Sequence, residues 1–190
     1  MGNREDLLAG ARKAIIERGV AKTTARDIAA AAGVSLAAIG YHFGSKDQLI
    51  TEALATALGT DIGDRMEALV RAGSGQPPLE AFTQMWNAMP QVFEDNLDCM
   101  LASLENLVRV ARTPESQTFM SESLTGAYEE IARAIQESRP DLDADTALAI
   151  GELYFMLTQG LGILWTITRG RNLPDGARMA KAIAALAGES

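Results

Sequence analysis

The sequence has little of two residue types on which many enzymes and secreted proteins depend. Its 190 residues include one cysteine, Cys99, and one histidine, His42. A single cysteine cannot form a disulfide within the chain, which is typical of proteins of the reducing cytoplasm. A single histidine excludes a metal site built from several histidines and leaves no spare imidazole for a Cys-His or Ser-His-Asp arrangement.

Motifs of catalysis are also missing from the sequence. It has no Gly-rich phosphate loop after a strand, no CxxC and no HExxH. Its paired carboxylates, Glu94 with Asp95 and Glu129 with Glu130, are adjacent, so the two members of a pair point to different sides of a helix. We therefore predict that the protein is not an enzyme and needs no cofactor or metal.

The sequence also lacks the segments that direct a chain to a membrane. It does not open with a basic stretch followed by an apolar one, which argues against secretion. Its most apolar uncharged run, Leu153 to Thr168, has 16 residues, whereas a membrane span needs about 20. These features predict a cytoplasmic protein that does not enter the membrane.

The residues that are present are largely apolar and acidic. Hydrophobic residues make up 47% of the chain, and the net charge is −8. Residues 1–55 carry seven Lys or Arg against six Asp or Glu, and residues 56–190 carry ten against nineteen. An acidic C-terminal surface repels DNA, whereas a nearly neutral N-terminal part is compatible with specific DNA binding.

Helical periodicity runs through the chain, and no alternating strand pattern stands out. Gly and Pro separate the helices, and Gly73–Pro78 forms the clearest loop. We predict an all-α protein with a three-helix N-terminal head joined to a C-terminal helical bundle. About nine helices are expected, over residues 4–18, 24–32, 36–42, 45–70, 79–95, 98–112, 115–138, 143–169 and 175–187.

The segment from Thr23 to Ile50 has the layout of a helix-turn-helix, which places its second helix in the DNA major groove. Gly33 permits the tight turn between the two short helices. The residues placed to cap the helices are Thr24 with Asp27, Ser35, and Ser45 with Gln48. The residues expected to face inward are Ile28, Ala32, Ile39 and Phe43.

Three elements of this segment, TARDIAAAAGVS, YHF and GSKDQL, resemble the DNA-binding segment of the TetR family of bacterial transcriptional regulators. The resemblance covers about residues 5–55. It implies a DNA-binding domain at residues 1–55 and a variable helical domain at residues 56–190 that forms a homodimer and usually a small-molecule pocket. Two heads would then bind half-sites of a palindromic operator in double-stranded DNA.

The predicted DNA-binding residues are Thr23, Thr24, Arg26, Ser35, Leu36, Ala37, Ala38, Gly40, Tyr41, His42 and Lys46. Family members often carry Lys or Arg, Gly and Thr where this chain has Leu36, Ala37 and Ala38. Base readout must then rely on apolar contact with thymine methyls, on Ser35, or on Arg26.

The remaining residues of this set have other expected roles. Gly40 stands where an aromatic residue is common, which opens room for DNA. The residues expected to contact phosphates are Thr23, Thr24, Tyr41, His42 and Lys46. Simpler explanations exist for some of them: Thr24 and Ser45 as helix caps alone, His42 as a satisfied surface group, and Lys46 as a solvated residue of a first helical turn.

Met and aromatic residues recur at helical spacing in the C-terminal part, where they can form adaptable apolar walls. For any one of them, a place in the hydrophobic core is the simpler explanation. Polar groups that could orient a ligand are Gln84, Asn87, Asn106 and Gln159. The predicted ligand-binding residues are Phe82, Trp86, Met89, Phe93, Met100, Leu104, Tyr128 and Phe155.

The uncharged run from Leu153 to Thr168 is apolar on nearly all sides, so it must be buried on nearly all sides. One chain of this size offers one buried face, and a second copy would cover the other. In the family that the chain resembles, the last two long helices form a four-helix dimer interface. The predicted homodimer contacts are Leu157, Leu161, Leu164, Trp165, Ile183 and Leu186.

Together these features predict a sequence-specific DNA-binding transcriptional regulator. We predict a repressor that a small apolar or aromatic ligand releases from its operator, although the residues do not exclude activation. Two alternatives stay open: a regulator of this kind without a small-molecule effector, and a helical protein-interaction module with a vestigial DNA-binding head.

Overall fold

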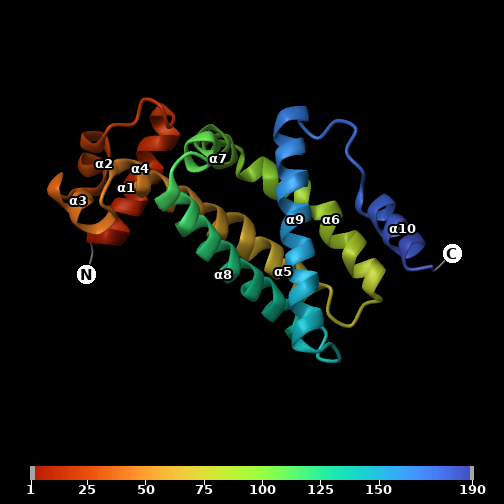
Figure 1. Ribbon diagram of the computed structural model, residues 1–190. Coiled ribbons are helices and arrows are strands. Elements are labelled where there is room, and N and C mark those ends of the chain that lie inside the picture. The colour runs from red at the N-terminus through yellow and green to blue at the C-terminus, as the bar shows by residue number, and fades with distance from the viewer. Residues whose placement is uncertain (1–2, 189–190) are drawn as a thin grey trace. The chain divides into compact units, whose positions relative to one another are not determined.

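The computed structural model describes residues 3–188, and its regular structure there is helical, as predicted (Figure 1). The predicted helix over 45–70 contains a π-helical turn, η1, with a glycine at each end, where helix propensity is low. The elements are α1 Asn3–Arg18, α2 Ala25–Ala32, α3 Ala37–Phe43, α4 Lys46–Leu58, η1 Gly59–Gly63, α5 Asp64–Ala72, α6 Pro78–Asp95, α7 Leu97–Val110, α8 Pro114–Ser138, α9 Ala144–Thr168 and α10 Gly176–Leu186.

The chain folds into two compact units. The head unit comprises Met1–Gly59 and Asp98–Leu124, and the body unit comprises Thr60–Leu97 and Thr125–Ser190. The head unit therefore holds α7 and the first part of α8 as well as the helix-turn-helix. The predicted division of function, with DNA binding in residues 1–55 and sensing with dimerisation in residues 56–190, stays a prediction.

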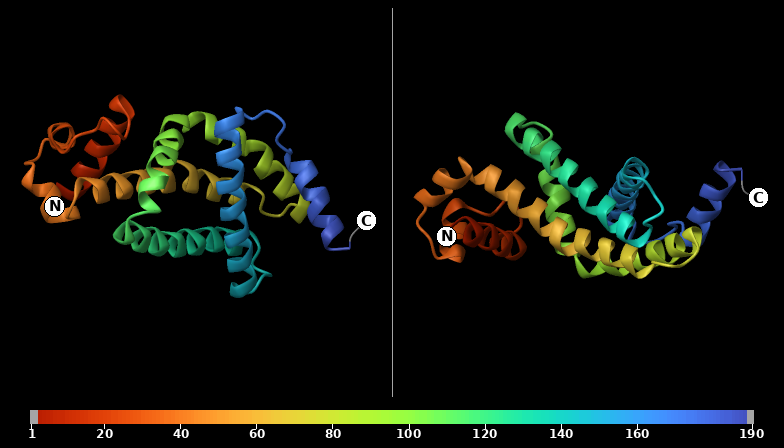
Figure 2. Two further views of the ribbon diagram at one scale, coloured as in Figure 1. Left: turned by 45° about the horizontal axis from the view of Figure 1, so that its top comes forward. Right: turned by 90° about the horizontal axis from the view of Figure 1, so that it is seen from below.

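One apolar core holds the head unit together. In Figure 2, α1, α2 and α3 gather around the start of α4. The side chains at the centre of this core are Leu7, Ile15, Ile28, Leu49 and Ile50. Burial of each of these aliphatic side chains stabilises the folded state by about 1.5–3 kcal/mol relative to leaving it exposed to water. From α7, Cys99 and Ala102 join the same core, which explains why this later helix belongs to the head unit.

Helices α1 and α2 approach so closely that only glycine fits at position 10. A Cβ atom at Gly10 would lie 2.7 Å from both the Cβ and the backbone nitrogen of Ala32. A backbone atom and an alanine Cβ cannot rotate away as the end of a long side chain can. The packing of α2 on α1 therefore depends on the missing side chain at Gly10.

The body unit is built around α6. Its Met and aromatic residues are mostly core: Phe82, Trp86, Met89 and Phe93 are all buried. Trp86 packs against Phe82 and against Tyr154 of α9, with ring centroids 5.8 and 5.9 Å apart. Burial raises the pKa of Tyr154 to about 12, so its hydroxyl keeps its proton even in mildly alkaline solution.

Two glycines set close helix contacts in the body unit. A Cβ at Gly151 of α9 would lie 3.0 Å from the carbonyl oxygen of Tyr128 in α8. Helix α10 runs beside α6 (Figures 1 and 2), where a Cβ at Gly176 would lie 2.3 Å from the carbonyl oxygen of Thr83. The Gly176 N–H donates to Asn87 Oδ1 over 2.8 Å and fixes the start of α10 on α6.

We expect Gly10→Ala to lower the free energy of unfolding by about 1–3 kcal/mol, because the added methyl group overpacks the contact with α2. Urea unfolding followed by circular dichroism measures the change. Gly40→Ala is the matched control, since its Cβ would meet no atom within 4 Å among the described residues. That control should stabilise α3 by up to about 1 kcal/mol through helix propensity. Equal effects of the two substitutions would contradict the close approach.

Candidate nucleic-acid interface

A capping box begins α2, as predicted. The Asp27 N–H donates to Thr24 Oγ1 over 3.2 Å, and the Thr24 N–H donates to Asp27 Oδ2 over 3.0 Å. The hydrogen bonds from the Thr24 hydroxyl and N–H hold the pKa of Asp27 below its usual value. Thr24 is exposed, but its hydroxyl is already engaged by Asp27.

The turn between α2 and α3 depends on Gly33. This residue adopts a left-handed conformation with φ of 67°, which favours glycine. The Val34 N–H donates back to the carbonyl of Ala29 over 3.1 Å and closes the turn. The chain can therefore reverse sharply and lay α3 across α2, as a helix-turn-helix requires.

The start of α3 differs from the prediction. Ser35 was expected to cap this helix, but Leu36 is the N-cap residue, and α3 begins without a side-chain cap among the described residues. The Ala38 N–H instead donates to the carbonyl of Ser35 over 3.1 Å, in a tight first turn. Ser35 itself is exposed.

The faces of α3 are sharply divided. Ala38, Ile39 and Phe43 are buried in the head core. The exposed residues are Leu36, Ala37, Gly40 and Tyr41, and Tyr41 is the most open of them, with 85% of its surface accessible. We call these four residues the α3 face. Ala38 was expected to reach base edges, but at 8% exposure it is a core residue instead.

Thr23 is also structural rather than exposed. It is 1% accessible, and its hydroxyl donates to the carbonyls of Gly19 and Ala14 over 2.7 and 3.2 Å. Both hydrogen bonds fasten the α1–α2 loop to the end of α1. A phosphate contact by the Thr23 hydroxyl is therefore not expected in this conformation.

The other predicted phosphate ligands lie near α3 and α4. His42 is half-buried, and its ring meets that of Tyr41 edge-on at 4.8 Å. Lys46, in the first turn of α4, donates to the carbonyl of Thr23 over 3.1 Å. Arg26 is exposed on α2. The α3 face is thus small and largely apolar, and it carries no Lys or Arg of its own.

Ser45 caps α4, but the predicted capping box is only half formed. The Gln48 N–H donates to Ser45 Oγ over 3.0 Å. The Gln48 side chain turns elsewhere: it donates to Glu52 over 3.2 Å and accepts from Ser116 of α8 over the same distance. Gln48 therefore ties α4 to α8 within the head unit.

Helix α7 holds both ends of the helix-turn-helix, which the sequence did not predict. Glu105 accepts hydrogen bonds from the N–H groups of Val20 and Ala21, over 3.3 and 2.9 Å. One turn later, Arg109 lies 3.0 Å from Asp47 and donates to Thr51, both in α4. These contacts join residues that are 58 to 85 positions apart, so local sequence signals do not reveal them.

The predicted ligand-binding residues fall into two groups by burial. Phe82, Trp86, Met89, Phe93 and Met100 are buried, and Leu104, Tyr128 and Phe155 are half-buried. Tyr128 and Phe155 meet edge-on at 5.2 Å within the body unit. Burial among apolar neighbours suits either a core or a ligand site, so the site stays a prediction.

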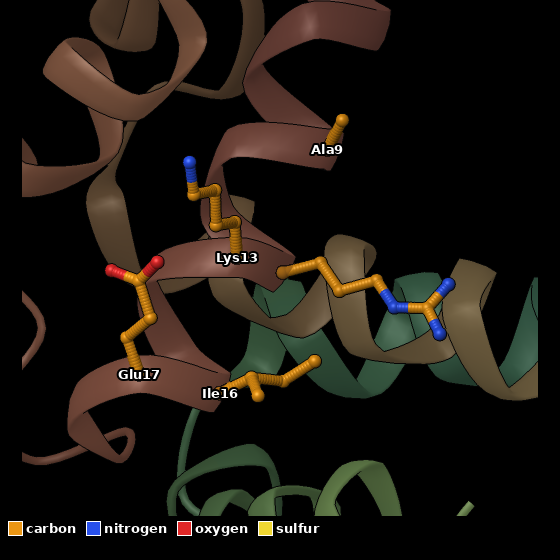
Figure 3. Close-up of a pocket in the computed structure, with 5 residues that line it drawn as sticks. Ala9, Lys13, Ile16 and Glu17 are labelled. Atoms are coloured by element: carbon orange, nitrogen blue, oxygen red, sulfur yellow. The ribbon is translucent and has the colours of Figure 1, made fainter.

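One pocket of the structure lies elsewhere, on the outer face of α1. Its lining residues are Ala9, Arg12, Lys13, Ile16 and Glu17 (Figure 3). Lys13 and Glu17 stand one turn apart along this side of the helix. None of the predicted ligand-binding residues lines this pocket.

The predicted dimer residues vary in exposure. Leu164 and Leu186 are exposed, whereas Leu157, Leu161 and Ile183 are half-buried. Trp165 is only 5% accessible and packs on Phe93, so most of it is covered by its own chain. By length and composition alone α9 could cross a membrane, but the core helix of a soluble protein can be equally long and apolar.

Further apolar side chains are exposed on α9, beyond those predicted. They are Leu153, Met156, Ile163 and Ile167. A contiguous stripe of exposed apolar side chains is typical of a surface that binds another molecule.

Comparison with known proteins adds to this geometry. The family model for bacterial regulatory proteins of the tetR family matches residues 7–53, which contain the helix-turn-helix. The transcriptional repressor KstR2 of Mycolicibacterium smegmatis is 29% identical over 147 residues, which cover 75% of this chain and 70% of that protein.

Solved structures share the fold over nearly the whole chain. The transcriptional regulator SCO7518 from Streptomyces coelicolor A3(2) matches with a TM-score of 0.62 and 24% identity, over 98% of both chains. The multidrug binding protein EbrR, solved in complex with imidazole, matches with a TM-score of 0.60 and 18% identity, over 96% of this chain and 93% of that one.

The sequence match, the shared fold and the exposed α3 face agree with one another. The matching family model and the relative KstR2 are described as transcriptional regulators and not as enzymes, in agreement with the prediction made from the motifs. Residues 7–53 of the chain match the DNA-binding segment of the TetR family of bacterial transcriptional regulators, and the chain as a whole is similar to members of that family.

Proposed function

We propose that this regulator is a cytoplasmic, homodimeric repressor that reads its operator through the α3 face and is released by a small apolar or aromatic ligand. The main support for operator recognition by α3 is its division into two faces. Ile39 and Phe43 are buried, whereas the α3 face of Leu36, Ala37, Gly40 and Tyr41 is exposed. Repression has support from the similar protein KstR2, which is named a repressor.

The chemistry of the α3 face favours apolar readout. Leu36 and Ala37 offer methyl groups, which suit the C5 methyl of thymine in the major groove. Gly40 has open space around it, so the DNA can approach the helix backbone closely. Tyr41 and Lys46 supply a hydroxyl and an ammonium group for phosphates, which position the head without reading sequence.

Dimerisation has support from α9. The α3 face itself carries no Lys or Arg, and pairing two heads on one duplex adds to the contacts that one head makes. The exposed apolar side chains of α9, with Leu164 among them, provide a surface that a second copy would cover.

The ligand has support from the body unit and from EbrR. The aromatic cluster of Phe82, Trp86 and Tyr154 suits a flat or apolar molecule. EbrR, which shares the fold, is named a multidrug binding protein. To release the operator, such a ligand must bind the DNA-free state more tightly than the DNA-bound state.

We expect Ala37→Glu to weaken operator binding by about tenfold or more, because a carboxylate on the α3 face repels phosphates and cannot pair with thymine methyls. Fluorescence anisotropy, with a duplex selected from a random library by the wild-type protein, measures the affinity. Ala9→Glu is the matched control, because Ala9 is an exposed alanine of α1 outside the α3 face. The proposal fails if both substitutions weaken binding equally or if neither does.

We expect Ile167→Asp to produce monomers at micromolar concentration and to lower operator affinity, because a carboxylate would be buried without a partner in the dimer. Sedimentation velocity measures the oligomeric state. Leu107→Asp, at an exposed position of α7, is the control and should leave the dimer intact. A wild-type protein that is monomeric at this concentration would contradict the proposed dimer.

We expect some member of a panel of apolar aromatic compounds to raise the melting temperature and to weaken operator binding. A ligand at 100 times its Kd stabilises the folded state by about 2.7 kcal/mol. Quenching of Trp86 fluorescence, measured in a Trp165→Phe background, reports binding near the aromatic cluster. If the compounds that stabilise the protein all leave operator affinity unchanged, release by a ligand is refuted and a regulator without such an effector remains.

A further inference from the structure

We propose that Arg109 of α7 is a positioning residue for DNA binding. By pairing with Asp47, it keeps the Lys46 ammonium group available to a DNA phosphate. This inference rests on the phosphate contact of Lys46 proposed above. Helix α7 lies well after the helix-turn-helix in the sequence, beyond α4, α5 and α6. The proposal gives it a defined electrostatic effect on DNA binding by the head.

One carboxylate oxygen lies between two cations in the head unit. Asp47 Oδ1 is 3.0 Å from Arg109 Nη1 and 3.7 Å from Lys46 Nζ. Arg109 therefore holds the closer pairing, and Lys46 makes the longer one. The shorter contact of Lys46 is a hydrogen bond of 3.1 Å from its Nζ to the neutral carbonyl oxygen of Thr23.

Arg109 is held ready for this pairing by buried neighbours. Its Nε donates to Asn106 Oδ1 over 2.9 Å, and its Nη2 donates to Thr51 Oγ1 over 3.1 Å. Asn106 and Thr51 are both buried and are hydrogen-bonded to each other over 3.3 Å. A planar guanidinium fixed in this way loses little conformational entropy when it binds a carboxylate.

Lys46 is a different kind of cation. Its ammonium is a point charge on a flexible stem, and its side chain is about one third exposed. Its shortest contact is with a neutral carbonyl and its ion pair with Asp47 is long, so more of its charge remains for a phosphate than a short ion pair would leave. Without Arg109, Lys46 would be the nearest cation to Asp47, and closing that adjacent pair would cancel the charge that DNA meets.

The same helix is anchored to the other side of the helix-turn-helix. Glu105 accepts the N–H groups of Val20 and Ala21, in the loop that leads to Thr23. Helix α7 therefore acts on both partners of Lys46: Arg109 pairs with Asp47 directly, and Glu105 binds the loop that leads to the Thr23 carbonyl. A displacement of α7 would change the Arg109–Asp47 distance and thereby the phosphate affinity of Lys46.

The test measures operator affinity as a function of salt, because each phosphate contact adds about 0.9 to the slope of log K against log salt. The probe is the selected duplex, in about 50–200 mM KCl. We expect Arg109→Met to weaken binding roughly fivefold and to reduce the slope by about one per head, as Lys46→Gln does. Adding Asp47→Asn to Arg109→Met should restore the slope, because no carboxylate then competes for Lys46.

Asp47→Asn alone separates the proposal from a purely structural role. This substitution also breaks the Arg109–Asp47 pair, so a structural role predicts weaker binding, as in Arg109→Met. We instead expect binding at least as tight as wild type and an unchanged slope. Melting temperatures check that each variant is folded, and the single Asp47→Asn variant keeps the test decisive if Arg109→Met unfolds.

Arg112→Met is the charge control, because Arg112 is an exposed arginine just beyond the end of α7. It should change the slope far less than Arg109→Met does. If Lys46→Gln leaves the slope unchanged, the proposed phosphate contact falls. If Lys46→Gln lowers the slope and Arg109→Met does not, or if Arg112→Met matches Arg109→Met, this inference alone is overturned.

Discussion

The contact between α1 and α2 at Gly10 is the constraint on which the DNA-binding head depends. A backbone nitrogen of α2 lies where a side chain of α1 would begin, so the two helices can pack only around a residue without a Cβ. This packing fixes α2, the Gly33 turn then fixes the direction of α3, and the core residues Ile39 and Phe43 fix its rotation. The exposure of Leu36, Ala37, Gly40 and Tyr41 is the consequence.

The charge of the protein fits this picture of the head. A chain with a net charge of −8 gains little from non-specific attraction to DNA, so its affinity must come from a few well-placed contacts. The availability of the Lys46 charge for a phosphate therefore matters more than it would on a strongly basic surface. The polar cluster of Asp47, Thr51, Asn106 and Arg109 adjoins Lys46 and can determine how strongly its ammonium group pairs with Asp47. The cluster belongs to the same compact unit as the helix-turn-helix.

The sequence predicted those features whose signals are local. The Thr24–Asp27 box, the Gly33 turn and the Ser45 cap each depend on residues at most five positions apart, and the structure has all three. Two expectations for α3 differ from the structure: Ser35 does not cap the helix, which begins at Ala37 without a side-chain cap, and Ala38, which was expected to reach base edges, is buried in the core. The hold of α7 on the head was not predicted, because Glu105 and Arg109 bind residues far away in sequence.

Readout of thymine methyls by the α3 face can be tested by replacing thymine with uracil in the operator. Uracil differs from thymine only by the missing C5 methyl group, so it leaves the phosphates and the hydrogen-bonding edge of the base unchanged. Footprinting of the selected duplex identifies the two protected half-sites, which should lie about one helical turn, or a multiple of it, apart. We expect uracil at specific thymines within these half-sites to weaken binding, and uracil outside them to leave the affinity unchanged. Full affinity on a duplex with uracil at every protected thymine would contradict it.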